Sequence, residues 1–267
     1  MGELLKANFL TNFAYYRRSR LLLAFLLVFL ALTGLYSIPP LFTDSVFQSF
    51  NALQEIFSIL NELLLFFAGG LGLFIISSHL SSRNLKMVFT KPCPPAVWLA
   101  AAFLSAVAVS FLLIGAVLVS AVALSFGWHV PVRAGLVFVS LDTFIASVGI
   151  IAYLILLAML VHPAVAVALA LIFNAGLFYE AQLWAQSMIR SGNSSFSLRA
   201  IEKLFHYLYL LLPMVHVFGE KTDKISGSLR VGHGDWKYLL YSLGYALALS
   251  AFCYCVALSA LQKKRHI

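Results

Sequence analysis

The chain has 267 residues and a formal net charge of +8; 62% of its residues are apolar and only 10% are charged. Because a soluble domain carries about 25% charged residues, this composition excludes an ordinary soluble globule, a disordered chain and a fibrous repeat. It also excludes a porin-like barrel, whose strands alternate apolar and polar residues. We therefore expect an all-α polytopic membrane protein that forms a single transmembrane domain over residues 1–267. The excess of Lys and Arg then belongs near cytoplasmic loops and lipid headgroups rather than on nucleic acid.

The first 20 residues predict an amphipathic helix that lies on the inner membrane face. Apolar residues recur there at helical spacing, and three arginines follow them: Leu5, Phe9, Phe13 and Tyr16, then Arg17, Arg18 and Arg20. The uncharged run 21–38 comes next and predicts the first membrane span. Since basic residues collect on the cytoplasmic side, these arginines place the N-terminus in the cytoplasm.

The second span is expected at 57–78, after an external loop at 39–56 that holds acids but no Lys or Arg. The span contains a glycine cluster at 69–72. Small residues would let another helix approach closely at this point.

Four more spans follow a basic cytoplasmic segment at 79–97. They are expected at 98–126, 134–161, 164–183 and 238–261, each as a run of predominantly apolar residues. His162 and Pro163 make a tight internal turn between two of them. The basic tail that begins at Lys263 places the C-terminus in the cytoplasm.

Residues 184–237 are harder to assign, because the distribution of basic residues fits six and seven spans about equally well. The apolar stretch 204–218 is short for a crossing and contains Pro213. We therefore expect six spans, with 184–237 as an external loop and 204–218 as a re-entrant or interfacial helix within it.

Polar residues within or near the spans are candidates for function, because an ionisable group in hydrocarbon is costly. There are four: Glu62, Asp142, Asn174 and Glu180. Glu62 and Glu180 stand close to the outer ends of their spans and could simply reach the headgroups. Asp142 and Asn174 lie deeper, and two interpretations stay open for them, namely hydrogen bonding between helices and a place on a substrate pathway.

Motifs for bond chemistry are absent from the sequence. It contains no H-E-x-x-H, no G-x-S-x-G and no phosphate-binding loop, so no catalytic residue is predicted. The seven histidines are scattered and the three cysteines form no C-x-x-C, so no metal site is predicted either.

The most specific pattern follows the second span, in residues 76–106. Leu85, Met87, Val88, Phe89, Thr90, Lys91 and Pro92 match a pattern of aliphatic residues followed by Ser/Thr-Lys-Pro. With this loop and its six-span organisation, the chain resembles the type-2 ABC transporter permease family. Arg83 and Asn84 stand where that family usually has Gly-Thr.

The resemblance implies a permease subunit in the cell's inner (cytoplasmic) membrane. Its partners would be a separate ABC ATPase, which binds the ATP and Mg²⁺, and a second copy or a homologous permease. This chain would bind no cofactor of its own. Segment 79–97 would be the ATPase-coupling segment, through Arg83, Asn84, Leu85, Lys86, Val88, Phe89, Lys91 and Pro92.

Two functions of other classes stay open beside transport. One is a membrane-embedded enzyme acting on a lipid-linked substrate, with Asp142, His129 and 204–218 near the outer face. The other is a scaffold that transports nothing. The residues specify neither the transported substrate nor its direction, and they do not distinguish a homodimer from a heterodimer.

Overall fold

The computed structural model describes residues 2–41, 46–80, 94–132, 134–173, 175–191, 196–212 and 231–265. Within these ranges the chain forms helices joined by short connections, without any strand. The helices are α1 (Gly2–Arg18), α2 (Arg20–Leu41), α3 (Val46–Leu80), α5 (Pro95–Gly127), α6 (Ala134–Leu160), α7 (Pro163–Ile172), α8 (Ala175–Arg190), α9 (Phe196–Leu211) and α10 (His233–Arg265). The predicted all-α fold is confirmed for this part of the chain.

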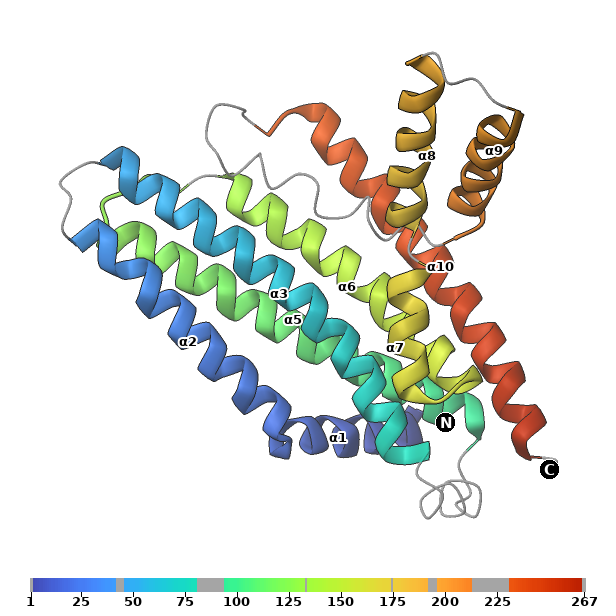
Figure 1. Ribbon diagram of the computed structural model, residues 1–267. Coiled ribbons are helices and arrows are strands. Elements are labelled where there is room, and N and C mark those ends of the chain that lie inside the picture. Colours follow the sequence, from blue (N-terminus) through green and yellow to red (C-terminus); the bar gives the residue numbers. More distant parts are fainter. Residues whose placement is uncertain are drawn as a thin grey trace.

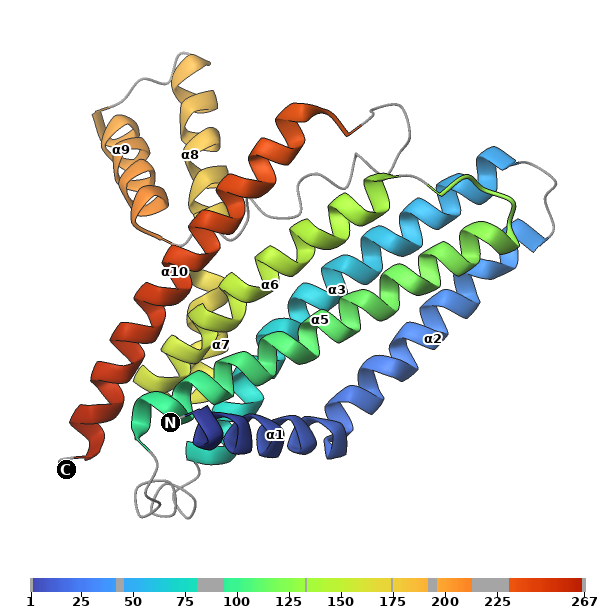
Figure 2. The ribbon, with the colours of Figure 1, turned by 180° about the vertical axis from the view of Figure 1, so that it is seen from behind.

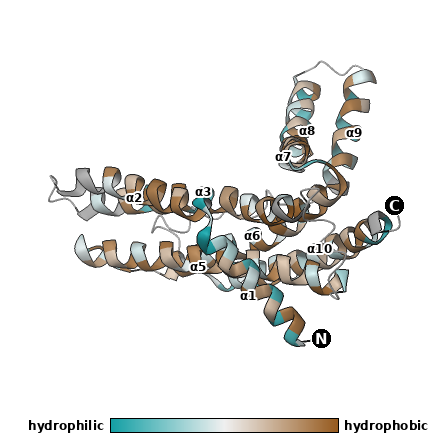
Figure 3. Ribbon diagram, turned by 90° about the horizontal axis from the view of Figure 1, so that it is seen from below, coloured by the Kyte–Doolittle hydropathy of each residue, from teal (hydrophilic) through white to brown (hydrophobic). Residues whose placement is uncertain are grey.

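Four of these helices are long and apolar enough to cross a membrane. Their apolar segments are Asn51–Ser77 in α3, Pro95–Gly127 in α5, Ala134–Leu160 in α6 and His233–Lys263 in α10. The shortest has 27 residues, or about 40 Å at 1.5 Å per residue, which exceeds a hydrocarbon core of about 30 Å. The chain is therefore a multi-pass membrane protein, and Figure 3 shows apolar shades along most of these helices.

The count of six spans stays a prediction. The helices α1 and α2 meet at a bend of 51° and add a fifth crossing if the pair is one span. The expected fifth span, 164–183, is divided between α7 and α8, which are separate helices. With ten residues, α7 is about 15 Å long, half the hydrocarbon thickness.

The long helices form a bundle around α6, which packs against α3, α5 and α10. Figures 1 and 2 show that α3, α6 and α10 begin at one end of the bundle and run in the same direction, while α5 runs the opposite way. The end of α3, the start of α5, the helix α1 and the end of α10 lie together at the other end. The predicted tight turn at His162–Pro163 is present there between α6 and α7, where the His162 ring accepts a hydrogen bond from the Ala164 amide.

Two apolar clusters fill the bundle, one toward each end. The cluster beside α1 includes Tyr16, Leu71, Leu99 and Ile151, which are fully buried. The cluster at the opposite end joins residues of α2, α3, α5 and α6, with Phe57 and Phe138 among the largest.

The glycines of α3 form the close helix contact that the sequence predicts. A Cβ atom added at Gly72 would lie 3.2 Å from the Ile151 carbonyl oxygen, and one added at Gly69 would lie 2.7 Å from Leu154 Cδ1. Both neighbours belong to α6. At Gly72 the neighbouring atom belongs to the backbone, so a side chain there would push the two helices apart by a few tenths of an ångström.

Some boundaries differ from the sequence-based expectation. Residues 46–56, expected in an external loop, are the first turns of α3. The helix expected at 204–218 begins earlier, as α9 at Phe196, and residues 213–218 lie outside the described residues. The apolar face expected on α1 is partly buried at Leu5, Phe9 and Phe13 and fully buried at Tyr16, because α1 packs on α5.

Candidate functional site

A layer of buried polar residues crosses the bundle at Asp142 of α6. The Asp142 side chain is 1% exposed, and Asn61 of α3 and Ser242 of α10 are 3% and 7% exposed. An ionisable residue such as Asp142 is rare inside a membrane helix and usually faces the interior of a bundle. We treat these three residues, the polar layer, as the candidate site.

A contact between α3, α6 and α10 places these three residues at a similar height along the bundle. Ala146 of α6 and Ala246 of α10 belong to one buried cluster, against which Leu65 of α3 packs. Asn61, Asp142 and Ser242 each precede one of these residues by four positions, and residues four apart lie on the same face of a helix. Because the three helices run in the same direction, all three polar side chains lie one turn away from this cluster toward the same end.

Some hydrogen-bonding groups near the layer are used within their own helices. The Asn61 amide donates to the Phe57 carbonyl over 2.6 Å, and the Thr143 hydroxyl donates to the Val139 carbonyl over 2.9 Å. Within the described ranges, the carboxamide oxygen of Asn61 and the hydroxyl of Ser140 have no hydrogen-bond partner. The layer therefore combines one carboxyl group with a spare amide oxygen, which suits interhelical hydrogen bonding or the passage of a proton or cation.

A second polar contact ties α5 to α6 about one turn further along. The Ser110 hydroxyl donates to the Ser147 hydroxyl over 2.9 Å, and Ser147 in turn donates to the Phe144 carbonyl over 2.7 Å. Both serines are buried. This pair is a hydrogen bond between two membrane-spanning helices, of the kind that contributes about 0.6 kcal/mol on average.

The other predicted intramembrane residues do not join the layer. Glu62 is exposed on α3, adjacent in sequence to Asn61 but on the outer side of the helix, and Glu180 is exposed on α8. Asn174 lies outside the described residues. Of the four predicted residues, Asp142 is the one that the described structure places in the bundle interior.

The predicted ATPase-coupling residues, from Arg83 to Pro92, also lie outside the described residues. Their flanks are described: α3 ends at Leu80, and α5 begins at Pro95. Proline suits the first helical position because its fixed φ matches the helix and its missing N–H would have no partner there.

Two tyrosines tie other helices to α3 and α5. The Tyr16 hydroxyl of α1 donates to the Leu71 carbonyl of α3 over 2.7 Å, and the Tyr254 hydroxyl of α10 donates to the Ala96 carbonyl of α5 over 2.8 Å. Tyr16 is fully buried, and burial raises the pKa of its phenol above the usual value near 10. The phenol therefore keeps its proton and remains a donor at physiological pH.

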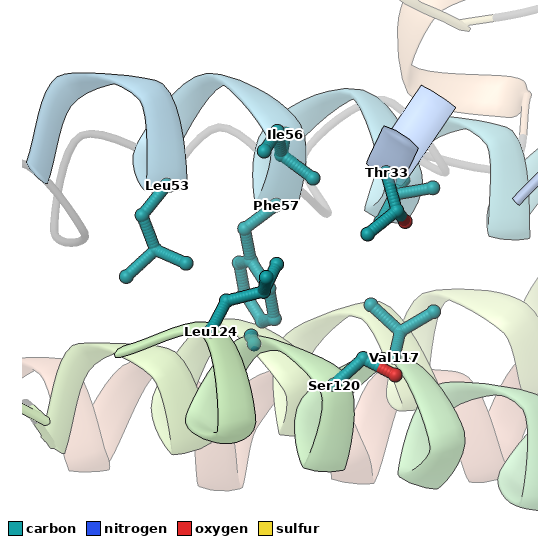
Figure 4. A pocket seen from close by; sticks show the side chains of 9 residues that line it. Thr33, Leu53, Ile56, Phe57, Val117, Ser120 and Leu124 are labelled. Atoms are coloured by element: carbon teal, nitrogen blue, oxygen red, sulfur yellow. The ribbon is translucent and has the colours of Figure 1, made fainter. Parts of the chain in front are cut away.

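Two small hollows lie between the long helices. One is lined by Thr33 of α2, by residues of α3 such as Phe57, and by residues of α5 such as Ser120 (Figure 4). The other lies between α5, α6 and α10, beside Ser250 and Cys253. Each has a cavity volume of only about 10 Å³, room for about one water molecule, and is therefore far smaller than a small-molecule site.

Sequence reasoning missed Asn61, Ser242 and the two tyrosine anchors. Asn61 and Ser242 are uncharged, so neither stood out beside Glu62 and Asp142. One sequence pattern could have pointed to them: in each of three spans, a polar residue stands four positions before a small or apolar residue. That signal becomes meaningful only when the packing partner of each helix is known.

Across the described ranges, no three His, Cys, Asp or Glu side chains gather in a way that could hold a metal ion. Comparison with known proteins adds no further evidence, because no family model, curated protein or solved structure matches this chain.

Proposed function

We propose that the chain is the membrane-spanning permease subunit of an ATP-binding-cassette transporter that exports a substrate. It would pair with a second copy or a homologous permease and with a separate ATPase, which binds ATP and Mg²⁺. It would lie in the inner (cytoplasmic) membrane, with both termini in the cytoplasm. The pattern in residues 76–106 that resembles type-2 permeases supports this proposal, as does the multi-pass helical fold.

The observation that carries the proposal is the pair of tyrosine hydrogen bonds to α3 and α5, the two helices between which the coupling segment lies in the chain. In the chain the segment lies between α3 and α5, and these helices are bonded to α1 and α10 through Tyr16 and Tyr254. A push on the segment would therefore displace four helices together. Such rigid-body movement of packed elements is how transporters expose a path alternately to the two sides.

Binding of an ATPase tests the proposal most directly. The ABC ATPase encoded by a neighbouring reading frame should co-purify with the full chain, and the complex should hydrolyse ATP faster than the ATPase alone. Phe89→Ala should weaken the complex by about 2 kcal/mol, or about 30-fold, because a buried aromatic side chain often dominates a small interface. Lys86→Ala is the matched control, since an exposed ion pair contributes about 0–1 kcal/mol.

The result that would contradict the proposal is a complex undiminished by Phe89→Ala, or equal losses for the two variants. Neither residue lies in a predicted span, so both variants should be inserted into the membrane at the wild-type level. A quantitative membrane blot of each variant checks this before the binding measurement.

The membrane topology is tested separately. A reporter fused after Ile267 should read as cytoplasmic, and one inserted near Gly227 should read as external, because six spans separate the cytoplasmic N-terminus from the cytoplasmic tail. Two reporters on the same side would refute the six-span topology.

A further inference from the structure

The helices α8 and α9 form a hairpin that projects from the bundle and whose main contacts are between its own two helices (Figures 1 and 2). Phe178 and Phe205 meet near its base, with ring centroids 6.1 Å apart. Closer to the tip, the Gln186 amide donates to the Glu202 carboxylate over 3.1 Å. The described residues therefore form a pair of packed helices here, and the re-entrant or interfacial helix expected at 204–218 stays a prediction.

One face of this hairpin is apolar and exposed. At 100° per residue, Leu177, Trp184 and Met188 lie on one flank of α8, and Ile201 and Leu204 lie on one flank of α9. Their side chains are between 36% and 55% exposed. Because the helices are antiparallel and touch through Phe178 and Phe205, the two flanks face the same side of the hairpin. We call these five residues the apolar face.

The opposite face carries polar and positively charged residues, together with the exposed side chains of Leu183, Phe196 and Tyr207. The pairs Gln186–Glu202 and Gln182–His206 lie on this side, the second with its ring nitrogen and amide oxygen 3.4 Å apart. The helical spacing places three exposed basic residues on the same side: Arg190, Arg199 and Lys203. All three stand in the half of the hairpin nearer its tip, whereas the aromatic contacts lie nearer its base. We call these three residues the basic cluster.

We propose that the α8–α9 hairpin binds the phospholipids of one membrane leaflet. Acyl chains cover the apolar face, and the basic cluster contacts the phosphates of anionic lipids. This assignment concerns a surface that the proposed ATPase coupling does not use, so it can succeed or fail independently of transport.

Charge complementarity favours lipid over a second copy of the chain. The basic cluster lies across the hairpin from the apolar face. This is the arrangement of an amphipathic helix at a membrane interface, in which apolar side chains face the acyl chains and cations face the headgroups. A phospholipid leaflet presents phosphates directly beside acyl chains.

The apolar face is tested with Trp184 in the full-length protein, reconstituted in nanodiscs. Subtracting the emission of Trp184→Phe from that of the wild type isolates the fluorescence of this side chain. Phosphatidylcholine brominated on its acyl chains should quench this emission, and aqueous iodide should not. Quenching by iodide would place the face in water and overturn the proposal. If neither quencher acts and the emission differs between discs with one and with two copies of the chain, a second copy covers the face. That result would also overturn the proposal.

The basic cluster is tested with a small fraction of brominated lipid in an unbrominated phosphatidylcholine disc. Brominated phosphatidylglycerol should quench Trp184 more strongly than the same fraction of brominated phosphatidylcholine. Each basic side chain near an anionic surface contributes about a fivefold preference, so Arg199→Gln combined with Lys203→Gln should remove most of it. Lys237→Gln, which removes an exposed cation of α10, is the matched control and should leave the preference unchanged. Any of three results would overturn the role of the cluster. The two lipids could quench equally in the wild type, the preference could survive the double substitution, or the control could lose the preference to the same extent.

Discussion

Replacing Gly72 by Ala should destabilise the bundle, whereas the same replacement at Gly70 should stabilise it. Both glycines lie within α3, so each substitution gains about 0.5–1 kcal/mol from the higher helix propensity of Ala. They differ in what the new methyl group meets. At Gly72 the Cβ would lie 3.2 Å from the Ile151 carbonyl oxygen and 3.6 Å from Ile151 Cα, whereas at Gly70 nothing lies within 4 Å.

The magnitude follows from the kind of atom that is contacted. Ile151 is fully buried in α6, and its backbone cannot rotate away, so α3 and α6 must separate by a few tenths of an ångström. Overpacking of this kind costs about 1–3 kcal/mol. Gly72→Ala should therefore be about 1–3 kcal/mol less stable than Gly70→Ala. Gly69→Ala should fall between them, because the atom it meets is the end of the flexible Leu154 side chain.

Thermal unfolding of the purified protein in one detergent measures this order. The three variants differ by the same single methyl group, so changes in helix propensity cancel in the comparison. The reasoning about the α3–α6 contact would be refuted if Gly72→Ala melted at the same temperature as Gly70→Ala or at a higher one.

Three further predictions concern polar contacts. If Asp142 forms a hydrogen bond between helices, Asp142→Asn should retain assembly and Asp142→Leu should weaken it by about 0.6–2 kcal/mol. If Asp142 serves an ion or proton path, Asp142→Asn should lose transport while assembly stays intact. Full function in Asp142→Leu would discard both interpretations. Tyr16→Phe should lower stability by about 0.5–1.5 kcal/mol through loss of one buried hydrogen bond, compared by thermal unfolding with the exposed control Tyr241→Phe, and equal effects would argue against the anchor. A double-mutant cycle of Ser110→Ala and Ser147→Ala should give a coupling energy of about 0.6 kcal/mol, and additive effects would show that the two hydroxyls do not interact.

The apolar segments of α5 and α6 could be predicted closely because turn-forming residues follow each uncharged run. The expected 98–126 and 134–161 correspond to Pro95–Gly127 and Ala134–Leu160. The start of α3 could not be placed in the same way. Glu55 is exposed and its neighbours Leu53 and Ile56 are buried, so this stretch is amphipathic helix. Charged residues in the sequence mark where the lipid-embedded part of a helix ends. The helix itself can continue beyond that point, with its polar side facing outward.

The partners of each helix were the harder part to predict. The glycine cluster at 69–72 indicated a close contact without indicating that α6 makes it. The pairing of α8 with α9 could not be predicted from the short length of 204–218 and from Pro213, which led to the expectation of an external loop at 184–237. The charged and apolar residues of these two helices follow the helical period, and that period, rather than mean hydropathy, is the signal for an amphipathic hairpin.

The distribution of contacts suggests which helices could move together. The Gly72 contact fixes α3 on α6, and the Ser110–Ser147 hydrogen bond fixes α5 on the same helix. The Tyr254 hydrogen bond adds α10 at the end near the coupling segment. A displacement that begins between α3 and α5 would therefore carry α6, and with it Asp142, as part of one rigid unit. The α8–α9 hairpin has its main contacts within itself, so its leaflet contacts could stay in place while that unit moves.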